Sequence, residues 1–231
     1  MAGRFALKFL ITMIVGALLV LAAGTAYAHY LDYSAANNNG RVIYKYNDNL
    51  TQKYREYSNR AVREWNEAKD VTNSANFPRF VQKNTNNMTT VNVGACISGC
   101  DTALGYYQHY PGPKEDLIRL DQSELNTYRV EGQQKVTTHE FGHSGGIDHN
   151  NVGCAFTVMG GPTAPCESNF IWFPGSHDYN DVNNSPRLWN TNDFAKTYDE
   201  PTVLEKEYDE NGELGSKTVA YPDGSFRIYE Y

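Results

Sequence analysis

Apolar and polar residues alternate in several short runs along the first half of the chain, and after the first run they follow a helical period. Residues 41–46 alternate as a β-strand does. Beyond them, apolar residues recur at steps of three and four over roughly five turns, which predicts an amphipathic helix with its apolar stripe in a core. The stripe consists of Leu50, Tyr54, Tyr57, Ala61, Val62, Trp65 and Ala68.

Further short apolar runs predict more strands after this helix. The runs are 80–81, 89–93, 103–109 and 117–121. Pro111, between the last two runs, belongs to a Pro-Gly-Pro segment that ends a strand. Strands mixed with long helices place the chain in the α+β class.

The stretch from Val136 to Asn150 reads VTTHEFGHSGGIDHN and predicts a metal site. On a helix, His139 and His143 lie one turn apart on the same face, where both imidazoles can reach one zinc ion. Glu140 follows the first histidine and can lean over the metal without binding it.

The residues after this helix complete the pattern HExxHxxGxxH. Gly146 can end the helix, because glycine takes the left-handed conformation at little cost. The chain can then reverse and bring His149 to the metal as a third ligand. Three protein nitrogens leave a fourth position for water, which is typical of a catalytic zinc site. Met159 follows in Thr-Val-Met-Gly, as a methionine turn does.

The segments 136–144 and 146–149 resemble the active-site helix of the metzincin metalloendopeptidases, and within them the matrixins. The resemblance implies one catalytic Zn²⁺ ion and a domain over 41–199. Its fold would be a twisted, mostly parallel five-stranded sheet with an antiparallel edge strand, a long N-terminal helix, an active-site helix, and an irregular subdomain after Gly146. Residues from 192 to about 198 would form the closing helix of that domain.

The resemblance also implies how a substrate binds. Strand 103–109 would be the edge strand, and an extended protein or peptide substrate would pair with its free backbone groups. Residues 160–173 would form a pocket wall, for which simple core packing is an equal alternative. Of the histidines that bind a second, structural zinc in matrixins, the matching region has only His109. We therefore expect His109 to be an ordinary strand residue.

In this interpretation zinc and Glu140 together catalyse the hydrolysis of a peptide bond. Zinc lowers the pKa of its bound water to about 7, and Glu140 acts as the general base that later protonates the leaving amine. Met159 would pack beneath the ligands without binding the metal. The expected activity is that of a secreted zinc metalloendopeptidase.

The N-terminus predicts export. Arg4 and Lys8 precede an apolar run, and Ala26-Tyr27-Ala28 is typical of a cleavage site, so residues 1–28 are interpreted as a signal peptide. An uncleaved membrane anchor is the alternative, and residues 29–40 are expected to form a flexible arm. Removal of Arg4 and Lys8 with the signal peptide changes the formal net charge from −7 to −9. A negative net charge argues against nucleic acid as a partner. We expect a secreted monomer.

Four cysteines in an exported protein suggest two disulfides, with three connectivities open. We favour Cys96–Cys100 and Cys154–Cys166, because both close short loops, and the second would constrain the methionine turn. Residues 176–184 are rich in Asp and Asn, but their spacing does not match an EF-hand. A solvated loop is therefore expected there, and Ca²⁺ is not supported.

Residues 200–231 differ in character from the rest. Asn211-Gly212 and Asp223-Gly224 are hairpin-turn signals between alternating runs, and the arrangement is similar to one YD-type repeat of bacterial surface and toxin proteins. We expect a small β-hairpin extension that docks on the protease domain or on a surface partner, the latter through residues 203–231.

Two other functions fit the sequence. The chain could be a zinc hydrolase that acts on cell-wall peptides. Analysis of the cleavage products from casein and from peptidoglycan fragments would distinguish this hydrolase from an endopeptidase. It could also be a surface-binding protein with a vestigial protease site, although the intact Glu140 argues against this.

Overall fold

The structure, a computed structural model, describes residues 30–31, 33–83, 89–97, 100–150, 157–160, 171–186, 199–208 and 214–231. Several sequence predictions fall outside these ranges and stay predictions. They are the signal peptide 1–28, the pair Cys154–Cys166, most of the pocket wall 160–173 and the closing helix 192–198. Among the described helices, none combines the length and the apolar character needed to cross a membrane.

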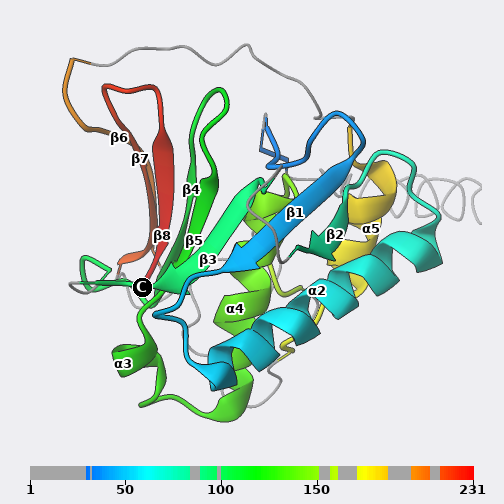
Figure 1. The fold of residues 1–231 in the computed structure, drawn as a ribbon, viewed down its shortest axis with the longest axis horizontal. Coiled ribbons are helices and arrows are strands. Elements are labelled where there is room, and N and C mark those ends of the chain that lie inside the picture. Colours follow the sequence, from blue (N-terminus) through cyan, green and yellow to red (C-terminus); the bar gives the residue numbers. More distant parts are fainter. Residues whose placement is uncertain are drawn as a thin grey trace, which may run out of the picture.

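The described strands form one mixed sheet in the order β2-β1-β3-β5-β4-β8-β7-β6 (Figure 1). Strands β2, β1, β3 and β5 pair in parallel, whereas β4, β8, β7 and β6 continue the sheet by antiparallel pairing. The strands are β1 (Arg41–Tyr46), β2 (Arg79–Gln82), β3 (Val91–Ala95), β4 (Gly105–His109), β5 (Asp116–Leu120), β6 (Thr202–Tyr208), β7 (Leu214–Ala220) and β8 (Phe226–Glu230).

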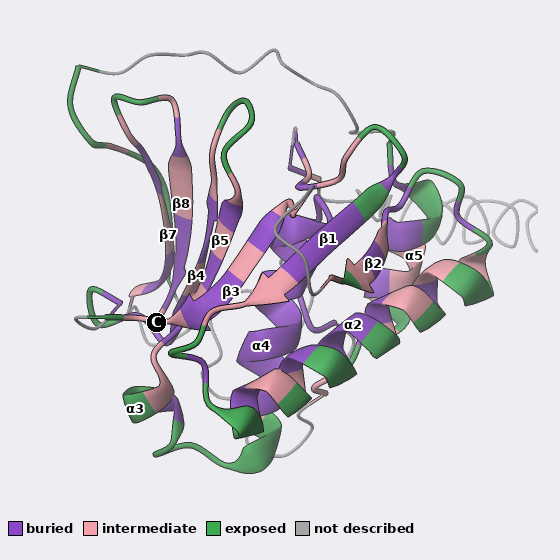
Figure 2. Ribbon diagram, viewed as in Figure 1, coloured by how far each residue is buried: buried purple, intermediate pink, exposed green. Residues whose placement is uncertain are grey.

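The described helices are α2 (Gln52–Thr72), α3 (Gln122–Leu125), α4 (Val130–Ser144) and α5 (Ser176–Asn184). Helix α2 packs against α4 and α5, while α4 also contacts β4 and β5. The buried Trp65 ties α2 to α4, since its indole Nε1–H donates to the carbonyl of Thr138 at 2.8 Å. The outer side of α2 is exposed, while α4 is buried along most of its length (Figure 2). The predicted α+β class is confirmed.

The expectation of an edge strand at 103–109 is wrong for this chain. The first five strands do end in an antiparallel β4, but β8 pairs with its other side from Gly105 to His109. The pairing satisfies backbone groups that would otherwise face solvent. It also places Ile228 in the main core, with Phe226 packed against it. The C-terminal strands thus extend the same sheet.

The expectation of a solvated loop at 176–184 is also wrong, because these residues form α5. Gly175 precedes the helix, and its N–H donates to the carboxylate of Asp178 at 2.7 Å, which closes the first turn as a capping residue does. Asp178 and Asp181 are buried. These two carboxylates make polar contacts inside the protein, and the composition of the segment alone does not reveal this.

The segment expected to be a flexible arm at 29–40 contacts the end of α4. The N–H groups of Leu31 and Ala35 donate to the carbonyls of Gly146 and Ser144 at 3.0 and 2.9 Å. Tyr33 is buried and its ring stacks on His109, with ring centroids 4.6 Å apart. These contacts satisfy carbonyls at the C-terminal end of the helix, which have no partner within it.

Candidate metal centre

Helix α4 carries the first two histidines of the motif into the interior. Twelve of its residues, from Gln133 to Ser144, are buried, although many are polar. Thr137 and Thr138 satisfy their hydroxyl groups by donating to carbonyls four residues earlier, both at 2.9 Å. Burying so polar a helix gains little hydrophobic free energy, so its place in the interior depends on such hydrogen bonds.

The chain reverses after α4 as the glycine predicts. The helix ends at Ser144, and Gly146 has a φ of 94°, a conformation that favours glycine. The N–H groups of Gly146 and Ile147 donate to the carbonyls of His143 and Gly142 at 2.9 and 3.1 Å. This turn brings His149 back against the helix.

The three predicted histidines lie together. The Nε2 atom of His149 is 3.1 Å from that of His139 and 3.2 Å from that of His143. A tetrahedral ion with bonds of about 2.0–2.1 Å has ligand atoms about 3.3 Å apart. The donor atoms are therefore spaced as ligands of one small cation.

The outer nitrogens of two of these rings fix their tautomers. His139 Nδ1 lies 2.9 Å from the carbonyl of Val158, and His143 Nδ1 lies 2.8 Å from the carbonyl of Ile147. Because a carbonyl can only accept, each Nδ1 carries the proton and each Nε2 keeps the lone pair that a metal needs. Burial lowers the pKa of His143 to about 4, so this ring is neutral at pH 7.

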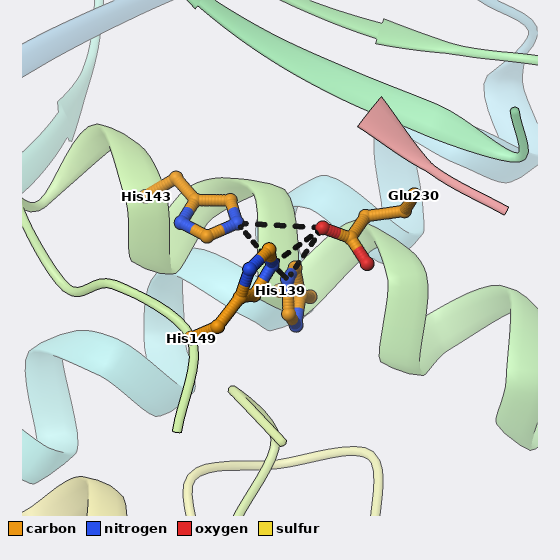
Figure 3. A group of neighbouring side chains, drawn as sticks. All are labelled: His139, His143, His149 and Glu230. Carbon is orange, nitrogen blue, oxygen red and sulfur yellow. Dashed lines mark hydrogen bonds and ion pairs between the residues drawn. The ribbon is translucent and has the colours of Figure 1, made fainter. Parts of the chain in front are cut away.

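Glu230 is the fourth member of the group, and the sequence analysis missed it (Figure 3). Its Oε1 atom lies 2.5, 3.3 and 3.7 Å from the Nε2 atoms of His149, His139 and His143. Burial alone would raise the pKa of Glu230, but the imidazoles of His149 and His139 hold it well below its usual value. A carboxylate and three imidazoles form a donor set that suits Zn²⁺.

One weak signal in the sequence points to Glu230. In the alternating strand β8 it shares a face with Phe226 and Ile228, which pack in the main core. A carboxylate in register with core residues is costly unless it is paired or bound to a metal. Nothing in the local sequence says which partner it meets, because His149 lies 81 positions away.

Glu140, the predicted general base, is buried beside this group. Among the described residues, neither of its carboxylate oxygens has a hydrogen-bond partner. Burial, and then the charge of Glu230, raise the pKa of Glu140 well above its usual value. A methyl group built on Gly105 would lie 3.0 Å from Oε1 of Glu140. The carboxyl group therefore lies against β4, the strand that was expected to hold a substrate.

Met159 is buried against α4, and Gly142 provides the space. A Cβ atom at Gly142 would collide with Sδ of Met159 and lie 2.8 Å from Trp65 Cζ2. The structure thus places Met159 against α4 at Gly142, and its role as a floor under the ligands stays a prediction.

Asp178 anchors the methionine turn, a role that the sequence analysis did not assign. Its carboxylate accepts from the hydroxyl of Thr157 and from the N–H groups of Val158 and Met159, the latter two at 2.6 and 3.3 Å. Burial raises the pKa of Asp178, although these hydrogen bonds oppose the rise. Because the Val158 carbonyl orients His139, Asp178 supports the group through the turn.

The other predicted residues lie outside the group. Cys96 and Cys100 form the predicted disulfide, with Cα atoms 5.7 Å apart. His109 pairs with Asp116 at 3.0 Å. Trp172, which belongs to the predicted pocket wall, lies under the guanidinium of Arg60, and the Cζ atom of Arg60 is 4.3 Å from the centroid of the Trp172 ring.

Comparisons with known proteins do not assign this site to a family. No protein-family model matches the chain. A search of curated proteins also finds no similar sequence.

Proposed function

We propose that this protein is a secreted zinc-dependent endopeptidase of the metzincin type, similar to the matrixins. The proposal is carried by one observation, the convergence of three Nε2 atoms beside the buried carboxyl group of Glu140, which has no hydrogen-bond partner among the described residues. A structural metal site needs ligands but has no use for a second carboxyl group without partners. A hydrolase needs such a group as its general base.

Zinc, held by His139, His143 and His149, would supply Lewis acidity to the scissile carbonyl and to a water molecule. Glu140 would take the proton of that water and later deliver it to the leaving amine. Burial, and then the charge of Glu230, raise the pKa of Glu140 above its usual value, which makes its carboxylate a stronger base for this cycle. The carbonyls of Val158 and Ile147 would keep two rings oriented throughout.

The test compares Glu140→Gln with the wild type and with Glu131→Gln, a matched change at an exposed position of the same helix. Zinc content and casein cleavage are measured for each protein, and again in a Glu230→Gln background that lacks the fourth protein ligand. We expect one zinc per chain throughout and an activity reduced roughly 10²- to 10⁴-fold by Glu140→Gln alone. If the wild type or the Glu230→Gln protein cleaves casein and its Glu140→Gln counterpart cleaves casein equally fast, the assignment of Glu140 is refuted.

A second function is favoured by Glu230. Three imidazoles and one carboxylate complete a tetrahedral shell, and closed shells are typical of structural zinc. The chain would then be a binding module that the metal stabilises, with Glu140 as a vestige. Metal binding without any cleavage of casein or of peptidoglycan fragments, in every background, would support this alternative. Activity on peptidoglycan fragments alone would identify a hydrolase of cell-wall peptides.

A further inference from the structure

Strand β8 occupies the whole free side of β4. Its residues pair antiparallel in a continuous register, from Glu230 opposite Gly105 to Phe226 opposite His109. The N–H of Leu104, just before β4, also donates to the carbonyl of Glu230 at 2.5 Å. An extended peptide that binds by strand addition needs these same backbone groups. A substrate and β8 therefore cannot occupy β4 together.

The side chain of Glu230, which belongs to the same strand, lies among the three histidines of the candidate metal site. Its carboxylate faces all three Nε2 atoms, and it is buried there (Figure 3). A tetrahedral ion bound by three imidazoles and this carboxylate has no position left for water or for a substrate carbonyl. One strand thus blocks both the backbone site and the metal.

We propose that β8 is an intramolecular inhibitor that keeps the protease latent, with Glu230 as the removable fourth ligand of the metal. The inference rests on the proposed function, because latency has meaning only for an enzyme. Release of β8 from β4 is then the activating step. It frees the backbone of β4 and a coordination position at the same time.

Side chains on the other face of the sheet hold β8 in place. The hydroxyl of Tyr229 donates to Asp101 at 2.9 Å, and the guanidinium of Arg227 donates to Oε1 of Gln108 at 2.7 and 3.0 Å. Strand β7 adds Ser216, whose hydroxyl lies 3.4 Å from Nδ1 of His149. The hairpin of β7 and β8 therefore binds the site as one unit.

The chain that leads into this unit is accessible. Residues 199–201 are exposed, and β6 exposes the apolar side chains of Val203 and Leu204. In contrast, Ile228 and Glu230 of β8 are buried. A protease or a partner that acts on the latent form would reach residues 199–204 first. Release would then spread from this edge of the sheet to β8.

The test measures access to the metal directly. Full-length wild type, Glu230→Gln and Glu205→Gln are loaded with Co²⁺, which accepts the same nitrogen and oxygen ligands, and titrated with acetohydroxamate while the absorption spectrum of Co²⁺ is recorded. Glu205→Gln is the matched control, since Glu205 is an exposed residue of β6. Because an intramolecular ligand competes at high effective concentration, Glu230→Gln should bind acetohydroxamate about tenfold or more tightly than the other two.

Two results would overturn the proposal. Equal affinity for acetohydroxamate in all three proteins would show that the carboxylate does not occupy the metal. Loss of Co²⁺ in Glu230→Gln and also in Glu230→Asp, which keeps the charge, would make Glu230 a structural ligand rather than a removable one.

Failure of the proposed function is recognised separately. Tighter binding of acetohydroxamate in Glu230→Gln, combined with no cleavage of casein even after a cut at residues 199–201 has released β8, would leave the closed metal site standing and refute the endopeptidase. Cleavage by all three proteins with equal acetohydroxamate affinities would do the reverse.

Discussion

Helix α4 and strand β8 both bring side chains to the metal group, but they do so in different ways. The helix supplies His139 and His143 from one turn, so their spacing is visible in the sequence. The strand supplies Glu230 through pairing with β4, a contact between distant segments. The difference teaches that a short motif can reveal the donors of a metal site while hiding what closes it.

The largest expected contrast between the two regions is in metal affinity. Each ligand contributes part of the free energy of metal binding. We therefore expect His143→Ala to weaken Zn²⁺ binding by roughly 10²- to 10³-fold. Glu230→Gln should weaken it far less, because three nitrogens remain. Competition with a chromophoric chelator measures both. Equal losses would mean that β8 is as much a part of the site as α4.

The sequence predicted well those features that depend on a local pattern, as the histidine pair on α4 does. Alternation located β1 at Arg41–Tyr46 as observed, and the three-and-four period located α2, which extends to Thr72. These successes share a cause, since both patterns report on burial within one element. The histidine spacing has the same local character.

The sequence could not predict what depends on pairing between distant segments. Nothing in residues 226–230 selects β4 as a partner, because any edge strand offers the same backbone groups. Asp178 was missed for a related reason, since its partners, Thr157 to Met159, lie about twenty residues before it. Its neighbours in an Asn-rich segment suggest a surface loop instead.

The second prediction tests whether β8 can be removed. A site-specific cleavage sequence placed at 199–201 should let the C-terminal strands dissociate after cutting. Cutting lowers the effective concentration of the inhibitor from roughly millimolar to that of the protein itself. We expect activity per molecule to rise about tenfold or more as the cut protein is diluted to submicromolar concentration.

The uncut insertion variant is the control, and its activity per molecule should not change with dilution. Identical behaviour of the cut and uncut proteins, with the fragment shown to dissociate by gel filtration, would mean that β8 does not restrain the enzyme.

A third prediction concerns the packing of α4. Gly142→Ala would place a methyl group against Met159 and within 2.8 Å of Trp65. Overpacking of a buried site should lower the free energy of unfolding by about 2–3 kcal/mol, as measured by urea denaturation of the zinc-loaded protein. The double variant with Met159→Ala should lose less than the sum of the single changes. Strict additivity would show that the two side chains do not share this space.

The smallest effect is expected at Asp178, which acts on the ligands at one remove. In Asp178→Asn, one carboxylate oxygen becomes an amino group, so donors such as the N–H groups of Val158 and Gly175 lose their acceptor. The loss should be about 1–2 kcal/mol in the free energy of unfolding and about tenfold or less in zinc affinity. Asp199→Asn, at an exposed position, is the control and should change neither quantity. A zinc affinity that falls as far as in His143→Ala would mean that the methionine turn, and not the histidine spacing on α4, limits metal binding.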